Sequence, residues 1–148
     1  MAAAIAVVGS LNVDFVLGMA RFPAPGETVV GRDFAVFPGG KGANQAYAAA
    51  RLGGQVRMIG QVGSDAHAGW LKQGLAAVGV DVSGVLTDPA VSSGIALIAI
   101  DGSGQNQIVI VPGANGSFTV ERWQATGKAL DAAFVRSEER RVGKECRL

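Results

Sequence analysis

Short apolar runs closed by glycine or polar residues recur along the chain and predict buried strands. Residues 5–8 form a continuous apolar run that ends at a glycine and a serine. This pattern is typical of a parallel strand buried on both faces and followed by a polar turn. Residues 56–62 predict a second buried strand, and residues 80–86 predict another strand.

Two segments between these runs have the composition of helices. Residues 44–52 consist largely of good helix formers, and Gly53 and Gly54 after them favour a helix end. Ser64 or Asp65 can cap a second helix. The apolar positions expected on its buried face are Leu71, Leu75, Ala76 and Val78.

Other apolar pieces are interrupted by turn residues and predict exposed β-structure. Between residues 15 and 37 they alternate with proline and glycine, which indicates a small, partly exposed β-meander. Residues 94–101 and 107–111 flank the sequence GSGQN and predict a hairpin. A second sheet is therefore expected beside the core sheet.

The apolar pattern ends with one more predicted helix and strand. Ser117 or Thr119 can cap a helix over residues 120–130, and residues 132–135 predict the start of a further core strand. The elements of the core alternate in β-α-β-α order. The sequence therefore predicts an α/β fold with a mostly parallel sheet, and 148 residues suit one domain.

Composition excludes several classes of function. Apolar stretches such as residues 95–100 and 108–111 fall far short of the roughly 20 residues that cross a bilayer. The first residues lack the basic-then-apolar order of a signal peptide, so a cytoplasmic location is the default expectation. A single cysteine, Cys146, and a single histidine, His67, exclude a disulfide framework and multi-cysteine or histidine-cluster metal motifs.

Basic charge is concentrated near the carboxyl end of the chain. Five of the 13 lysines and arginines lie in residues 136–148, while residues 1–135 carry 8 basic and 9 acidic side chains. A nearly neutral body gives no electrostatic reason to expect nucleic-acid binding. The basic tail needs a separate explanation.

The first candidate site residues are Asn12 and Asp14, just past the first predicted strand. In open α/β sheets, ligands bind in the crevice at the carboxyl ends of the strands. An ionised aspartate accepts hydrogen bonds from hydroxyl groups, and an asparagine amide both donates and accepts, so the pair suits a polyol. The spacing alone fits equally well the alternative that both side chains stabilise a turn.

The second candidate is the sequence GGKGAN at residues 39–44. Its glycines permit backbone angles closed to other residues and let a ligand approach the main chain. Asn44 lies near the predicted helix start, where free N–H groups favour polar or anionic ligands. The segment is not a Walker A loop, because Ala35 and Gly42 replace the required glycine and hydroxyl residue. The alternative is a plain tight connection with a solvated Lys41.

These segments resemble the signature of the ribokinase-like (pfkB) carbohydrate kinase family. The signature places small residues and an asparagine at set distances, and residues 39–46, Gly53 and Gly63 satisfy every element. The likeness spans residues 5 to about 135, and the lysine-glycine pair is more typical of the family's ribose kinases than of its fructokinases or adenosine kinases. Further segments that carry the resemblance are residues 8–14, 22–28 and 112–115.

The resemblance implies a three-layer α/β/α fold with a small β-sheet lid formed by residues 15–37 and 94–111. It implies that the lid covers a bound sugar, excludes water and often pairs with a second subunit as a homodimer. It also implies a set of sugar-binding residues. These are Asn12, Asp14, Gly40, Lys41, Gly42 and Asn44, with Ala114 and Asn115 near the sugar.

The implied activity is ATP-dependent phosphorylation of ribose with Mg2+, with a monovalent cation as a further candidate cofactor. The family's general-base aspartate and glycine-rich anion hole have no counterpart here, so we expect an amino-terminal part, residues 1–135, without turnover of its own. Residues 136–148 look like a translated sequencing adapter, with a natural charged terminus as the alternative. Alternative functions are another sugar or nucleoside kinase, such as a deoxyribokinase, or a non-catalytic sugar-binding module.

Overall fold

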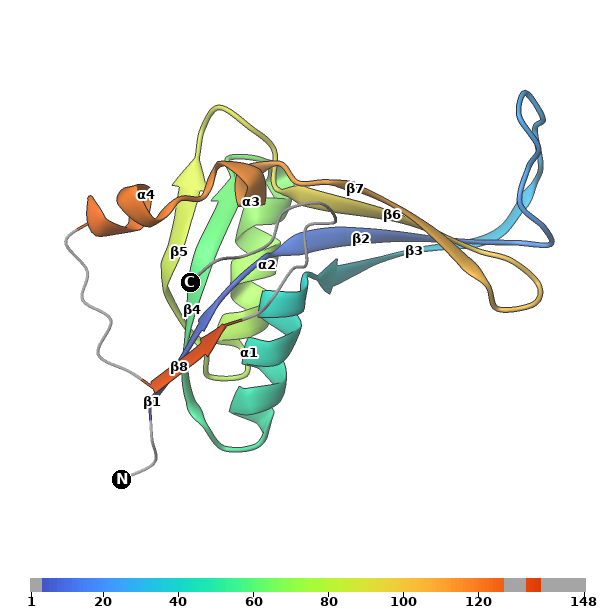
Figure 1. The fold of residues 1–148 in the computed structure, drawn as a ribbon. Coiled ribbons are helices and arrows are strands. Elements are labelled where there is room, and N and C mark those ends of the chain that lie inside the picture. The colour runs from blue at the N-terminus through green and yellow to red at the C-terminus, as the bar shows by residue number, and fades with distance from the viewer. Residues whose placement is uncertain (1–3, 127–132, 137–148) are drawn as a thin grey trace.

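A computed structural model of the chain describes residues 4–126 and 133–136, which form two four-stranded sheets (Figure 1). The core sheet has the order β5-β4-β1-β8, and all of its strands are parallel. Its strands are β1 (Ala4–Val8), β4 (Gln55–Gly63), β5 (Asp81–Asp88) and β8 (Ala133–Arg136). The predicted parallel core sheet is therefore confirmed.

Two helices cover one face of the core sheet. They are α1 (Lys41–Arg51) and α2 (Ala66–Ala76), and the main hydrophobic core lies between them and the sheet. Met58 of β4 and Leu71 and Leu75 of α2 are almost fully buried there. Ala76, predicted on the same face, is exposed instead. The side chain of Asp65 caps α2 by accepting hydrogen bonds from two backbone N–H groups of its first turn.

The opposite face of the core sheet carries a thinner cover. Trp123 of α4 (Val120–Gln124) packs against Ala6 of β1 and Ile59 of β4, so the fold has helices on both sides of the sheet. Thr119 caps α4, as predicted, but the helix ends at Gln124 rather than near residue 130. Residues 127–132 lie outside the described residues.

The second sheet, called the outer sheet below, projects away from the core sheet as a long ribbon (Figure 1). Its order is β3-β2-β6-β7, with β2 and β6 parallel and the two outer pairs antiparallel. The hairpin predicted around residues 102–106 is the β6-β7 pair. The strands are β2 (Asn12–Met19), β3 (Gly31–Gly39), β6 (Gly94–Ile100) and β7 (Asn106–Val111).

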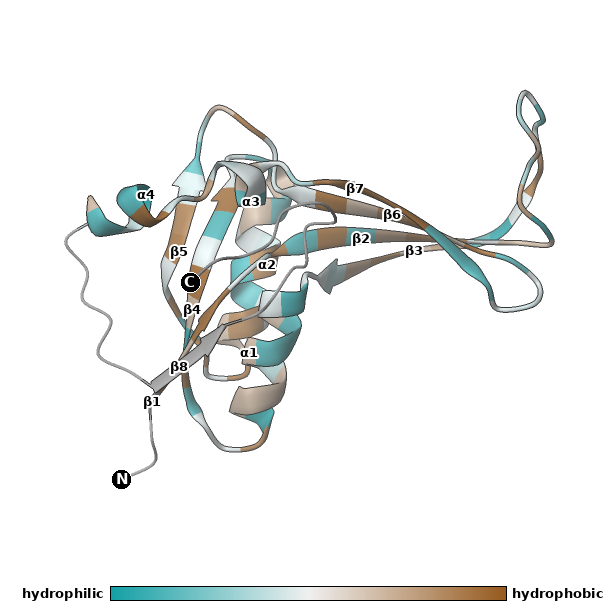
Figure 2. Cartoon of the chain, viewed as in Figure 1, coloured by the Kyte–Doolittle hydropathy of each residue, from teal (hydrophilic) through white to brown (hydrophobic). Residues whose placement is uncertain are grey.

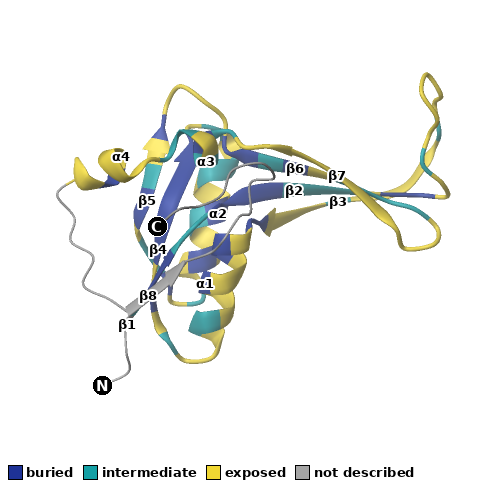
Figure 3. Cartoon of the chain, in the orientation of Figure 1, coloured by how far each residue is buried: buried dark blue, intermediate teal, exposed yellow. Residues whose placement is uncertain are grey.

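The outer sheet is rich in apolar residues, and many of them are exposed (Figures 2 and 3). Strand register assigns Phe15, Phe34 and Leu97 to the face on the α2 side, where Phe15 contacts the ring of His67. Asp14 and Ile110 belong to the opposite face. The two faces therefore have different neighbours.

Two further expectations about element limits are wrong. Helix α1 begins at Lys41 instead of residue 44, and β2 begins at Asn12 instead of residue 15. Asn12 and Asp14 consequently lie within a strand and not in a turn. A four-residue helix, α3 (Ala114–Ser117), was not expected. Residues 137–148 lie outside the described residues, and no helix in the described part is long and apolar enough to cross a membrane.

Candidate functional site

The candidate site lies where the core sheet passes into the outer sheet. The chain leaves β1 and enters β2 at Asn12, and it returns along β3 to the glycine loop that opens α1. Asn12 is paired with Gly39 in the strand register. The two candidate motifs, separated by about 25 residues in sequence, are therefore neighbours in the fold.

Close backbone packing explains the glycines of the loop. Gly40, the N-cap residue of α1, has a φ of 96°, and a Cβ atom there would lie 2.5 Å from the carbonyl oxygen of Ser10. A Cβ atom at Gly42 would lie 2.7 Å from the Cα atom of Gly9. The N–H group of Ala43 donates a hydrogen bond of 3.0 Å to the carbonyl of Ser10. The amino end of α1 is thus held against the segment that follows β1.

Asp14 carries a partly buried carboxylate with no hydrogen-bond or ion-pair partner among the described residues. Its oxygens lie over the Cα atom of Gly39, in the space that a side chain at Gly39 would occupy. Burial raises the pKa of the Asp14 carboxyl above its ordinary value of 3.8. A desolvated carboxylate without a partner is costly, so this geometry favours a ligand that donates hydrogen bonds to it.

Asn12 is 7% exposed and is held by the side chain of Asn115. The Nδ2 group of Asn115 donates a hydrogen bond of 2.8 Å to Oδ1 of Asn12. Within the described part of the chain, Nδ2 of Asn12 has no acceptor. Asn12 and Asp14 are two residues apart on β2 and therefore share a face of the outer sheet. The site thus combines an unpaired donor with an unpaired acceptor.

The remaining predicted residues occupy different surroundings. Lys41 and Asn44 are exposed in the first turn of α1, close to the loop. Ala114 is fully buried in α3, and its carbonyl oxygen accepts a hydrogen bond from Gln61. The side-chain amide of Asn115 is hydrogen-bonded to Asn12 and to the backbone of Leu11, so it is occupied by protein groups. The structure therefore gathers seven of the eight predicted residues around the start of β2 and the loop, and encloses Ala114.

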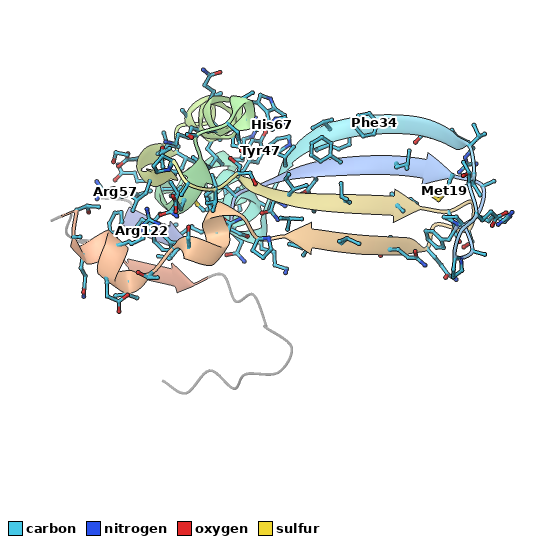
Figure 4. The ribbon with its side chains drawn as sticks, turned by 90° about the horizontal axis from the view of Figure 1, so that it is seen from above. Met19, Phe34, Tyr47, Arg57, His67 and Arg122 are labelled. Carbon is cyan, nitrogen blue, oxygen red and sulfur yellow. The ribbon has the colours of Figure 1, made fainter. Side chains whose placement is uncertain are left out.

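Asn44 also borders a cavity of about 320 Å3 between α1, α2 and the end of β3. Its walls are mostly apolar and include Leu11, Tyr47 and Leu71. Figure 4 shows Tyr47 and His67 on the helices beside the base of the outer sheet and Phe34 farther along β3. Asn12 and Asp14 do not line this cavity, so it is separate from the pair of polar groups on β2.

Sequence reasoning missed a polar network at the carboxyl ends of β4 and β5. Asp88 accepts hydrogen bonds from the hydroxyl of Ser117 at 2.7 Å and from Arg122 at 2.5 Å. The hydroxyl of Ser117, the N–H group of Ala90 and Arg122 hold the pKa of Asp88 at about 2. Gln61 donates to the same group of residues. The members lie far apart in sequence, and no local motif signals them.

A second missed network fixes the start of β6. Asp65 accepts hydrogen bonds from the backbone N–H of Ser93 at 2.6 Å and from its hydroxyl at 3.0 Å. Ser93 in turn accepts a hydrogen bond from the N–H of Gly63. Burial alone would raise the pKa of Asp65, but these hydrogen bonds and those of the α2 cap lower it overall. This junction holds the outer sheet to the end of β4.

The described residues offer hydroxyl-binding groups but no assembled metal site. They contain no cluster of three or more histidine, cysteine, aspartate or glutamate side chains that could share a metal ion. The backbone N–H groups at the start of α1 and the polar pair on β2 suit a small polar molecule with several hydroxyl groups.

Comparison with known proteins gives a consistent result. The model of the pfkB family of carbohydrate kinases matches residues 2–137. The chain is 45% identical over 115 residues to the ribokinase of Bacillus subtilis, covering 78% of this chain and 39% of that protein. It is 40% identical over 111 residues to the deoxyribokinase of Salmonella typhi, covering 75% of this chain and 36% of that protein.

Solved structures agree with the sequence relatives. The structure of Arabidopsis thaliana ribokinase complexed with ribose and ATP matches with a TM-score of 0.70 and 37% identity, over 78% of this chain and 38% of that chain. The chain therefore spans about two fifths of the length of the relatives it matches. The fold is ribokinase-like, as the sequence predicted.

Proposed function

Because the chain belongs to the pfkB family of carbohydrate kinases, we propose that it forms the amino-terminal, sugar-binding part of an ATP-dependent ribokinase. Such an enzyme converts D-ribose and ATP to D-ribose 5-phosphate and ADP. The observation that carries the proposal is the pair of unpaired groups on β2. Among the described residues, neither the partly buried carboxylate of Asp14 nor the amide nitrogen of Asn12 has a hydrogen-bond partner.

In this proposal, each motif contacts the sugar from its own side. The Asp14 carboxylate accepts hydrogen bonds from sugar hydroxyls, and Asn12 contacts the same molecule from the start of β2. Gly40, Lys41, Gly42 and Asn44 approach from the amino end of α1, where the glycines leave the backbone accessible. Ala114 and Asn115 lie next to the site in α3 and hold its residues in place.

The outer sheet acts as the lid of this site. The face that carries Asp14 also carries apolar side chains, among them Phe37, Ile98 and Ile110, that can cover the sugar. Covering the sugar would keep water from competing for the phosphoryl group. The other face exposes large apolar side chains, which favours a homodimer formed through the lid. Those side chains are Leu17, Phe34, Leu97 and Val109.

Phosphoryl transfer requires more groups than the described residues bring together at the site. A hydroxyl of ribose must lose its proton while it attacks the γ-phosphorus of ATP, and Mg2+ neutralises charge on the phosphates when bound. The described residues provide one carboxylate at the site, Asp14, and no cluster of metal ligands. We therefore propose that ATP, Mg2+ and any monovalent cation bind mainly to other parts of the enzyme, and that this chain alone has no turnover.

A specific observation supports a second candidate substrate, 2-deoxyribose. The deoxyribokinase of Salmonella typhi is almost as similar to the chain as the ribokinases are. The two sugars differ by one hydroxyl group. Whether the site hydrogen-bonds to that hydroxyl group determines which sugar it prefers. A site built to bind a hydroxyl rejects a substrate that lacks it, because its own polar groups stay unpaired.

The test is a kinase assay on the protein encoded by the complete reading frame that contains this sequence. ATP-dependent phosphorylation of D-ribose should exceed that of 2-deoxyribose, fructose and adenosine, and Asp14→Asn should abolish it. A preference for 2-deoxyribose would move the assignment to deoxyribokinase. Failure to phosphorylate any sugar would contradict the proposal, as would robust ribose phosphorylation by the 148-residue chain alone.

A further inference from the structure

The side chain of Asn115 pairs with the backbone of Leu11 as a neighbouring strand would. Its Oδ1 atom accepts a hydrogen bond of 3.0 Å from the N–H of Leu11, and its Nδ2 group donates one of 3.0 Å to the carbonyl of Leu11. A backbone N–H can only donate and a carbonyl can only accept. These two contacts therefore fix which end of the Asn115 amide carries the oxygen.

The fixed amide of Asn115 determines the orientation of Asn12 in turn. The second hydrogen of the Asn115 Nδ2 group is donated to Oδ1 of Asn12, with a separation of 2.8 Å. Since the oxygen of Asn12 faces Asn115, its Nδ2 group faces the other way. That nitrogen has no acceptor within residues 4–126, while the residue as a whole is 7% exposed.

Two features of the fold hold this arrangement in place. Gly94 is opposite Asn12 in the β2-β6 register, and a Cβ atom at Gly94 would overlap both the Asn115 amide nitrogen and the Asn12 oxygen. The backbone around Asn115 is anchored by the N–H of Ala114, which donates a hydrogen bond of 2.8 Å to the carbonyl of Ser92. The network therefore connects β2, the start of β6 and α3.

We propose that Asn115 is a positioning residue that holds Asn12 as a hydrogen-bond donor toward the bound polyol. This inference rests on the proposed function, in which Asn12 and Asp14 bind the sugar. It assigns opposite hydrogen-bonding roles to the ligand at two neighbouring contacts: the ligand oxygen at Asn12 accepts a hydrogen bond, and the ligand hydroxyl at Asp14 donates one. A freely rotating asparagine could bind either a donor or an acceptor, so Asn115 restricts which ligand groups fit at Asn12.

The first test needs no ligand and uses side-chain amide signals in NMR spectra of the 148-residue chain. Both Nδ2 hydrogens of Asn115 should exchange slowly with solvent, while those of Asn12 should exchange faster. In Asn115→Ala the Asn12 signals should shift and broaden, and in the control Asn106→Ala, at the exposed first residue of β7, they should not. Rapid exchange at Asn115 in the unaltered chain would overturn the proposal whether or not the variant folds.

The second test measures binding of D-ribose and of its deoxy and deoxyfluoro analogues, because fluorine accepts a hydrogen bond weakly but cannot donate one. At the position that contacts Asn12, the fluoro analogue should bind better than the deoxy analogue. Asn115→Ala should abolish this difference and weaken ribose binding about tenfold, and Asn106→Ala should change neither. An unchanged preference in Asn115→Ala would contradict the positioning role. Absence of any sugar binding would instead count against the proposed function, and the amide exchange would still decide the orientation of Asn12.

Discussion

The carboxylate of Asp14 lies directly over the Cα atom of Gly39, in the volume that any larger residue at position 39 would fill. The two residues come from adjacent antiparallel strands, β2 and β3, and meet beside the loop that opens α1. This contact connects the two candidate motifs through packing alone. It explains why the first glycine of the loop is needed although its own backbone φ is not positive.

The variant Gly39→Ala tests this contact. The added methyl group should displace the Asp14 carboxylate and weaken ribose binding at least tenfold, a loss of about 1.4 kcal/mol. The matched control is Gly69→Ala in α2, where a Cβ atom would meet nothing within 4 Å. That control should bind normally and be more stable by about 0.5–1 kcal/mol, because alanine favours a helix over glycine. Calorimetric titration and urea unfolding measure both effects.

The variant Asp14→Asn should separate function from stability. Its amide keeps the shape of the carboxylate but removes a charge that burial disfavours, as the raised pKa of Asp14 indicates. We expect ribose binding to be lost and the thermal midpoint at pH 7 to stay the same or rise. A clear fall in the midpoint would mean that the Asp14 carboxylate stabilises the fold and would contradict its assignment to ligand binding.

The two tryptophans provide a matched test of the thin layer on the second face of the core sheet. Trp123 is 6% exposed and packs on Ala6 and Ile59, whereas Trp70 in α2 is 38% exposed. Trp123→Ala should lower the free energy of unfolding by about 3 kcal/mol, and Trp70→Ala by less than half as much. Urea unfolding followed by circular dichroism measures both. Equal losses would show that α4 does not form a packed layer on the sheet.

Acid should destabilise the polar network around Asp88. The folded protein holds the pKa of Asp88 at about 2, below the ordinary value of 3.8, so the ionised carboxylate favours folding. Its contribution is complete above pH 4 and is lost as the pH falls toward 2. Asp88→Asn should be less stable at neutral pH and should lose less stability than the parent between pH 4 and 2. Parallel pH profiles for the two proteins would contradict this role.

The elements that were predicted correctly are those whose structure is determined by residues close together in the sequence. The apolar runs of β1 and β4 and the capping side chain of Asp65 each act within a few positions, and the structure confirms them. The start of β2 was misplaced, although Leu11, Val13 and Phe15 alternate with polar residues in the period of a half-buried strand. The meander interpretation gave too much weight to the turn residues that follow.

Other features could not be predicted because they depend on distant contacts. The four residues of α3 have no strong helix preference, and the buried Ala114 is fixed by hydrogen bonds to Ser92 and Gln61. The pairing of Asn115 with Leu11 spans more than 100 positions. A single sequence contains no local signal for such a contact. The role of Asn115 therefore follows from the three-dimensional structure alone.

Titration of the isotopically labelled 148-residue chain with D-ribose, followed by NMR, tests the central claim most directly. We predict saturable shifts, in the millimolar range, that centre on Asn12, Asp14, Lys41 and Asn44 and are absent in Asp14→Asn. No saturable shift up to about 100 mM ribose, or shifts confined to the cavity between α1 and α2, would contradict the assignment of a sugar site to β2 and the glycine loop.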